Sequence, residues 1–187
     1  MAKRKRPNED GRDKLFAFVS PLDVLLKLRW EHVQFFRALH PPEALDEARY
    51  HALNACVTAY QLCDWVAFFI EKEIGWEVAA QRLGASPLAH KGHLQEWFWR
   101  QGPLVACQQI ALAYKHVDID AVAYRAEVRT QEGKISEPVR GRAYEFVVTT
   151  EHGEWDLVHV VSIACLVWEE VLEKLQLAAF VSPPKRA

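Results

Sequence analysis

The residues best suited to chemistry lie near the end of one predicted helix, which runs from Gly102 to His116. Gln109 precedes His116 by seven residues, about two helical turns, so their side chains share one stripe of the helix. Tyr114 and Lys115 stand beside the histidine in the last turn. Histidine is a common general acid or base near neutral pH. We therefore take Gln109, Lys115 and His116 as candidate catalytic residues and Tyr114 as a candidate binding residue.

The other stripe of this helix is apolar and suits a protein core. Its members are Leu104, Cys107, Ile110, Ala111 and Tyr114. The stripe that carries the polar residues also holds Val105, Leu112 and Ala113, and it is too apolar to be left entirely in water. This second face predicts contact with another helix, a ligand or a partner chain, and we expect a homodimer.

A further candidate is the carboxylate of Asp64, which lies in the long apolar segment from Tyr50 to Ile70. A lone carboxylate in such a segment is rarely buried without a partner, so we expect a buried pair. On a helical wheel one side of this segment gathers Asn54, Gln61, Asp64, Trp65 and Phe68. The candidate partners are Lys115, His116, His51 and a backbone amide at a helix start.

Two interpretations of Asp64 stay open at this point. In the first, its carboxylate makes a buried hydrogen bond that fixes helix packing. In the second, Asp64 and Asn54 face the same cleft as Gln109 and His116 and bind a ligand there.

The sequence offers little support for a metal or a cofactor. Cys56, Cys63, Cys107 and Cys165 lie in predicted helices among apolar neighbours, and none forms a CxxC pair. We expect reduced, buried thiols. The pair His90 and His93 falls in a loop, where histidines are usually solvated. The chain has no glycine-rich phosphate loop and no GxSxG sequence, which argues against a P-loop or Rossmann nucleotide site and against a serine nucleophile.

Composition indicates one ordinary globular domain. Of 187 residues, 50% are apolar and 26% are charged, and the net charge of -2 gives no general attraction to nucleic acid. The N-terminus is charged and has no apolar leader segment, so we expect a cytoplasmic protein. Asn54, Gln61 and Asp64 make the segment from Tyr50 to Ile70 costly to place in lipid, which predicts a core helix and no membrane partner.

The predicted organisation is a basic disordered tail over 1–14, one helical domain over 15–181 and a short tail over 182–187. Helices are expected over 21–39, 42–74, 76–83, 88–100, 102–116 and 156–177. In the first helix, the residues expected to face inward are Leu22, Leu25, Leu26, Val33 and Phe36. In the second they are Leu53, Cys56, Tyr60, Cys63, Ala67 and Ile70. In the last they are Val161, Ala164, Cys165, Trp168, Val171, Leu172 and Leu175.

Alternating residues over 122–129 and 144–148 predict two antiparallel strands, with turns at 131–134 and 151–153. The fold class is therefore mainly α: an up-down helical bundle with a small antiparallel β-sheet inserted at about 121–155, before the C-terminal helix.

The run from Ile110 to His116, after a long helix that carries Asp64 and Trp65, resembles prokaryotic HEPN-type helical domains. The resemblance covers residues 20–116 and the last helix. It implies a small bacterial helical bundle, often dimeric, and many such domains are metal-independent RNA-cleaving toxins of toxin–antitoxin and anti-phage systems. Their catalytic mark is an arginine followed, after four to six residues, by a histidine. His116 matches the histidine, but Gln109 stands where a six-residue spacing places the arginine.

Three functions follow as hypotheses. The first is a non-catalytic HEPN-like binding or dimerisation module in a defence, toxin–antitoxin or mobile-element setting, with RNA or another protein as partner. The second is an active ribonuclease that uses His116, with Lys115 or Arg100 replacing the missing arginine. The third is a structural assembly protein whose cleft serves packing alone.

Overall fold

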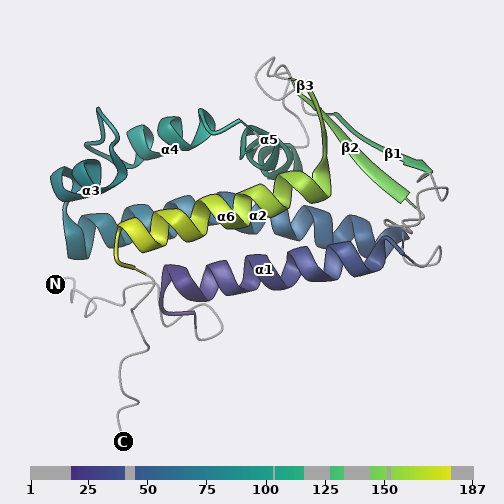
Figure 1. The fold of residues 1–187 in the computed structure, drawn as a ribbon, viewed down its shortest axis with the longest axis horizontal. Coiled ribbons are helices and arrows are strands. Elements are labelled where there is room, and N and C mark those ends of the chain that lie inside the picture. The colour runs from purple at the N-terminus through teal and green to yellow at the C-terminus, as the bar shows by residue number, and fades with distance from the viewer. Residues whose placement is uncertain are drawn as a thin grey trace, which may run out of the picture.

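The central element of the structure is helix α2, Leu45–Phe69, which is flanked along its length by two other long helices (Figure 1). The computed structural model describes residues 18–40, 45–102, 104–115, 127–132, 144–150 and 153–177. One buried row of α2 repeats at alternating spacings of four and three residues: Ala48, Ala52, Ala55, Ala59, Leu62, Val66 and Phe69. This spacing is that of a helix–helix seam, and its alanines let a neighbouring backbone approach closely.

Helices α1, Pro21–Ala38, and α6, Leu157–Lys174, run antiparallel to each other and both pack on α2 (Figure 1). Local sequence fixes where they begin. Ser20 and Asp23 form a reciprocal capping box at the start of α1, where Pro21 suits the first turn. Asp156 caps α6 by accepting a hydrogen bond from the backbone N–H of Val158 at 3.1 Å.

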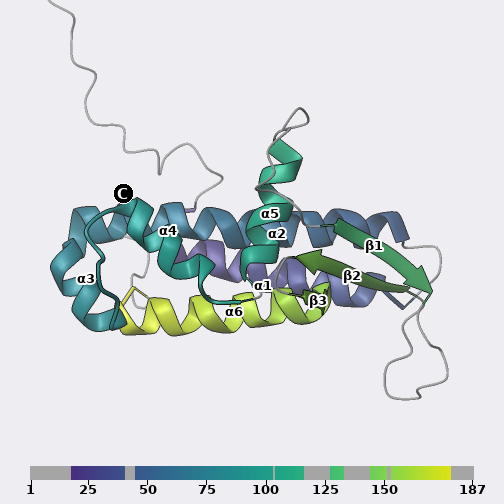
Figure 2. The same ribbon diagram turned by 90° about the horizontal axis from the view of Figure 1, so that it is seen from above.

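Three shorter helices pass over the same side of the α2–α6 pair (Figures 1 and 2): α3, Trp76–Leu83, α4, Lys91–Trp99, and α5, Leu104–Lys115. A π-helical turn, Ile70–Ile74, ends the long helix, and Gly75 follows with a φ of +86°. This positive φ favours glycine. The chain therefore reverses direction at Gly75 and brings α3 back over the bundle.

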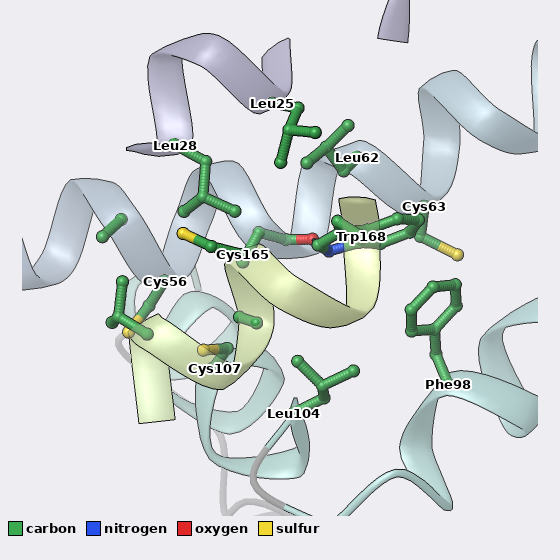
Figure 3. Close-up of a cluster of buried hydrophobic side chains, with 14 of the residues drawn as sticks. Leu25, Leu28, Cys56, Leu62, Cys63, Phe98, Leu104, Cys107, Cys165 and Trp168 are labelled. Atoms are coloured by element: carbon green, nitrogen blue, oxygen red, sulfur yellow. The ribbon is translucent and has the colours of Figure 1, made fainter. Parts of the chain in front are cut away.

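Trp168 of α6 joins these layers. Its indole Nε1 donates a hydrogen bond to the carbonyl of Ala59 at 2.9 Å, and its ring stacks on Phe98 with centroids 3.9 Å apart. Figure 3 shows Trp168 between α2 and the Phe98 ring of α4. A single buried aromatic residue thus ties α2, α4 and α6 together.

The small sheet has the order β1-β2-β3 and is antiparallel throughout (Figure 2). Its strands are β1, Glu127–Glu132, β2, Tyr144–Thr150, and β3, Gly153–Asp156. Phe146 and Val148 of β2 are buried in the main core, and the Phe146 ring meets Phe35 of α1 edge to face at 5.4 Å. The sheet is therefore attached to the bundle through β2, and β3 leads directly into α6.

The predicted fold class is confirmed: the described chain is mainly helical, with a small antiparallel sheet before the final helix. The predicted inward residues of the last helix are all buried. The prediction for α1 is confirmed for Leu25 but wrong for the other four residues, because Leu26, Val33 and Phe36 are 51%, 43% and 43% exposed and Leu22 is only half-buried. The face of α1 that packs inward carries Leu25 together with Val24, Leu28, Glu31, Phe35 and Ala38.

The reason for this error is that α1 is apolar on two sides. A helical wheel of α1 has one apolar stripe interrupted by Glu31 and a second one interrupted by arginines, and periodicity alone does not choose between them. The glutamate stripe packs inward because α2 supplies polar partners for Glu31.

Three smaller expectations also need correction. Leu53 and Tyr60 of α2 are half-buried rather than buried. Residues 131–132 belong to strand β1 and not to a turn, and the stretch from Gly153 adds a third strand where only two were predicted. Residues 122–126, like the tails over 1–14 and 182–187, lie outside the described residues.

Within the described chain, Leu45–Ile74 is the one helix that is long and apolar enough to cross a membrane by length and composition. Over its most apolar window, 56% of the residues are buried inside the bundle. The central helix of a folded bundle meets the same criterion, and α2 occupies that position here.

Candidate functional site

The residues proposed on α5 lie in different environments. Gln109 is only 7% exposed, whereas Tyr114, placed by sequence in the core stripe, is 64% exposed. Lys115 is the last residue of α5, and His116 lies outside the described residues. Val105, predicted on the outward face, is buried. The part of α5 near Gln109 is therefore core, and only its last turn reaches the surface.

The side chain of Gln109 carries an unusual feature. Its Oε1 atom is buried and has no hydrogen-bond partner within the described part of the chain. A buried carbonyl oxygen without a partner destabilises the fold, because it has lost its hydrogen bonds to water and forms none within the protein. Gln109 is thus a buried polar residue in the core and does not line an open cleft.

Asp64 does not form the buried pair that its sequence context suggested. Its carboxylate is 51% exposed and makes an ion pair with Lys91 at the start of α4, with Nζ and Oδ1 2.7 Å apart. This hydrogen bond raises the pKa of Lys91. Asn54 is exposed, and no described hydrogen bond or ion pair links Asn54 or Asp64 to Gln109. Asp64 therefore ties α2 to α4 at the surface.

A more concentrated polar cluster, which the sequence analysis missed, lies between α1 and α2. We call it the seam cluster: Lys27, Glu31, His51 and Thr58. Nδ1 of His51 lies 2.7 Å from Oε2 of Glu31, and Nζ of Lys27 donates to Oγ1 of Thr58 at 2.6 Å. Nζ of Lys27 also lies 3.4 Å from Oε1 of Glu31. Both carboxylate oxygens of Glu31 are thus engaged.

The geometry of the seam cluster has a chemical consequence. Because a carboxylate only accepts hydrogen bonds, Nδ1 of His51 donates to Glu31 and carries the ring proton. The other nitrogen, Nε2, lies on the side of Glu47, whose Oε1 is 3.9 Å away. A carboxylate that orients an imidazole in this way leaves the second nitrogen available as a proton acceptor. The same contacts fix α1 against α2.

A sequence signal for Glu31 existed. It lies three residues after Leu28 and four before Phe35, on the stripe of α1 that contains Val24. An acidic residue in such a stripe requires a partner on the helix it meets. His51, half-buried in the first half of α2, is that partner, but twenty residues separate the two and no local spacing reveals the contact.

An open groove lies where α1, β3 and the first turns of α6 meet. Its volume is about 580 Å³, within the range of small-molecule sites. The residues that line it are His32, Phe36, Glu154, Trp155, Asp156, Val158, His159 and Ser162. Burial lowers the pKa of His32. Neither histidine of this groove was identified from sequence, because each lies on a helix whose contacts depend on the tertiary fold.

The four cysteines are free and buried, as expected. The side chains of Cys56, Cys107 and Cys165 belong to one apolar cluster between α2, α5 and α6 (Figure 3). A hydrogen bond with Cys56 and burial raise the pKa of Cys107 well above its usual value. Burial raises the pKa of Cys63 and of Cys165 to about 12. These thiols stay protonated and are poor nucleophiles.

The pair His90 and His93 has structural roles at the start of α4, where His90 is the N-cap and His93 lies in the first turn rather than in a loop. Nδ1 of His90 accepts a hydrogen bond from the backbone N–H of Gly92 at 3.1 Å, which caps α4, and Nδ1 of His93 accepts one from Ala89 at 3.2 Å. Among the described residues, no three histidine, cysteine or acidic side chains gather in a way that holds a metal ion.

The described chain thus holds two groups of side chains suited to binding or catalysis, the seam cluster and the groove. Neither coincides with the residues singled out on α5. No protein-family model, curated protein or solved structure matches this chain.

Proposed function

We propose that this protein is a HEPN-like, non-catalytic module that binds a partner as a homodimer in a bacterial defence, toxin–antitoxin or mobile-element setting. The observation that carries the proposal is the exposed apolar face of α1. Leu26, Trp30 and Val33 follow one another at helical spacing and are 51%, 54% and 43% exposed. A contiguous apolar strip of this kind on a folded surface is typical of an interaction site.

Gln109 supports the absence of ribonuclease activity. At the position where the resemblance places a catalytic arginine, this chain has a neutral amide that is buried in the core. An amide cannot provide the positive charge that a guanidinium brings to a phosphate. The loss of such a group typically costs about 10²-fold or more in rate.

A second copy of the chain is the occupant that best fits the α1 face. Leu26 and Val33 lie on either side of Trp30, so a twofold axis near Trp30 sets Leu26 of one copy against Val33 of the other. Such an antiparallel pairing is the isologous contact of a twofold dimer. The apolar strip is therefore complementary to itself.

Charge favours the same arrangement. Arg29 of α1 pairs with Glu169 of α6, which places this acidic residue of α6 beside α1. Further along α6, the exposed Glu173 lies toward the N-terminal end of α1, because the two helices are antiparallel. A twofold axis near Trp30 brings this acidic end of one copy beside the exposed Arg37 of the other. Opposite charges then flank the apolar strip.

Oligomeric state tests the proposal directly. Light scattering at micromolar concentration is expected to give about twice the 21.5 kDa chain mass. Leu26→Glu should yield a monomer, whereas the control Val78→Glu, on the exposed side of α3, should leave the dimer intact. Arg37→Glu should weaken the dimer, and adding Glu173→Arg should restore it. A monomer mass for the wild-type protein in light scattering would contradict the proposed dimer.

A metal-independent ribonuclease is the second candidate, and the seam cluster is the observation that favours it. His51 is oriented by Glu31, and the Lys27 ammonium lies beside the same carboxylate. Histidine as a base and lysine as a cation are the groups that metal-free RNA cleavage requires. His116 remains the residue that the resemblance assigns to this chemistry.

We expect little or no cleavage when purified protein is mixed with single-stranded RNA in the presence of a chelator. Strong cleavage that His116→Ala or His51→Ala abolishes would establish the ribonuclease and overturn the non-catalytic proposal. A dimer that neither cleaves nor binds RNA and captures no partner would instead indicate an assembly protein.

A further inference from the structure

The groove between α1, β3 and α6 has a lining that selects for a particular ligand chemistry. Two of its side chains, Phe36 and Trp155, are aromatic, and Val158 beside them is buried. Three more, His32, His159 and Ser162, offer hydrogen-bonding atoms. An aromatic wall with a few polar groups is the usual composition of a small-molecule site.

Three polar side chains of the groove, His32, His159 and Ser162, can meet a ligand. Within the described part of the chain, the rings of His32 and His159 and the hydroxyl of Ser162 make no hydrogen bond or ion pair. His32 is half-buried, and burial lowers its pKa, so its ring is neutral at physiological pH. A neutral imidazole donates from one nitrogen and accepts at the other.

The charged groups of the groove are already engaged. Glu154 of β3 forms an ion pair across β2 with Arg129 of strand β1, and Asp156 caps the N-terminus of α6. Among the described residues that line the groove there is no lysine or arginine. Arg129 is already neutralised by Glu154, so this lining offers no unpaired cation to balance a phosphate or carboxylate.

We propose that this groove binds an uncharged, planar heteroaromatic molecule that both donates and accepts hydrogen bonds. The ring of the ligand lies against Trp155 and Phe36, where aromatic faces offer stacking or edge contacts. His32, His159 and Ser162 bond to its heteroatoms. The residues of this site differ from Leu26, Trp30 and Val33 of the proposed dimer face, although Phe36 lies on α1 next to that face.

Calorimetric titration of the full-length protein with adenine and with nicotinamide tests the proposal. At least one of the two is expected to bind, and His159→Ala and Ser162→Ala should each weaken its binding about tenfold, the effect of losing one hydrogen bond to the ligand. Tyr50→Ala, which removes an exposed aromatic ring from α2, is the control and should change nothing. Thermal unfolding of each variant verifies that it is folded.

Three outcomes would overturn the proposal: no binding of either compound at millimolar concentration, binding that both groove variants leave unchanged, or tighter binding of adenosine monophosphate than of adenine. The last result would show that a phosphate, and not a neutral ring, is recognised. Repeating the titration with Leu26→Glu separates this site from the dimer, since the monomeric variant should bind the ligand with unchanged affinity.

Discussion

Glu31 and His51 join α1 to α2 through a short hydrogen bond, with Oε2 and Nδ1 2.7 Å apart and the carboxylate only 6% exposed. The pair also involves Lys27, which approaches the other carboxylate oxygen. The seam between the two helices is therefore held by a polar network within an otherwise apolar core.

We predict that Glu31→Ala lowers the free energy of unfolding by about 3 kcal/mol, because it leaves His51 without its carboxylate and Lys27 with Thr58 alone. Urea denaturation measures the change. Glu31→Leu combined with His51→Leu should cost less than the two single changes added together, since the double variant strands fewer polar groups. Strict additivity would show that the two side chains are not coupled.

Much of the fold follows from the sequence. The 3.6-residue period of α6 and the proline at the start of α1 are local signals, and the structure agrees with both. The inward face of α1 was not predictable in this way. Which of the two apolar faces of α1 packs inward depends on whether Glu31 finds a hydrogen-bond partner, and that partner, His51, comes from the next helix.

The candidate site was less predictable than the fold. Spacing along α5 placed Gln109 on the polar stripe and Tyr114 on the core stripe, but spacing does not show which part of a helix other elements cover, and here Gln109 is buried and Tyr114 is exposed. The groove around His32 and His159 unites residues more than a hundred positions apart. Only the antiparallel packing of α1 and α6 brings them together.

The depressed pKa of His32 predicts a pH dependence of stability. The unfolded chain binds a proton at an ordinary histidine pKa, near 6.5, whereas the folded chain binds it only at lower pH. The stabilisation is therefore fully present above about pH 6.5 and is lost as the pH falls from there toward the folded-state pKa. Urea denaturation across this pH range should show the free energy of unfolding decreasing as the pH falls. In His32→Gln the part of this decrease that comes from His32 should be absent. An identical slope in the variant would contradict the assignment to His32.

Gln109 is expected to be a site where an apolar residue is tolerated or preferred. Gln109→Leu removes a buried oxygen that has no partner in the described chain, so stability should stay the same or rise by about 1 kcal/mol. Gln109→Arg, which restores the arginine of the HEPN pattern, should destabilise the fold, because it places a charge in the core. Thermal unfolding compares the two variants. A stable Gln109→Arg variant that gains RNA cleavage would instead show that this position reaches a catalytic site.

Asp64 is expected to contribute little to stability. Both it and Lys91 are about half exposed, and such surface ion pairs contribute about 0–1 kcal/mol. Asp64→Asn should therefore change the free energy of unfolding by less than about 1 kcal/mol. High salt screens the ion pair and should make the difference between wild type and variant smaller. A loss of several kcal/mol in urea denaturation would mean that the pair is far better shielded from water than its exposure indicates.

The cysteines provide a chemical test of the packing between α2, α5 and α6. The pKa values of Cys63 and Cys165 rise to about 12 through burial, and the pKa of Cys107 is raised well above its usual value by its hydrogen bond with Cys56 and by burial. Thiolates are the reactive species, so at about pH 8 the folded protein should react with a thiol reagent only as fast as it opens. All four cysteines should react promptly once urea unfolds the chain. Cys107→Ala should leave the slow reaction of Cys63 unchanged if the bundle stays closed. Rapid labelling of any native cysteine would show that the helix packing around it opens far more readily than a closed apolar core allows.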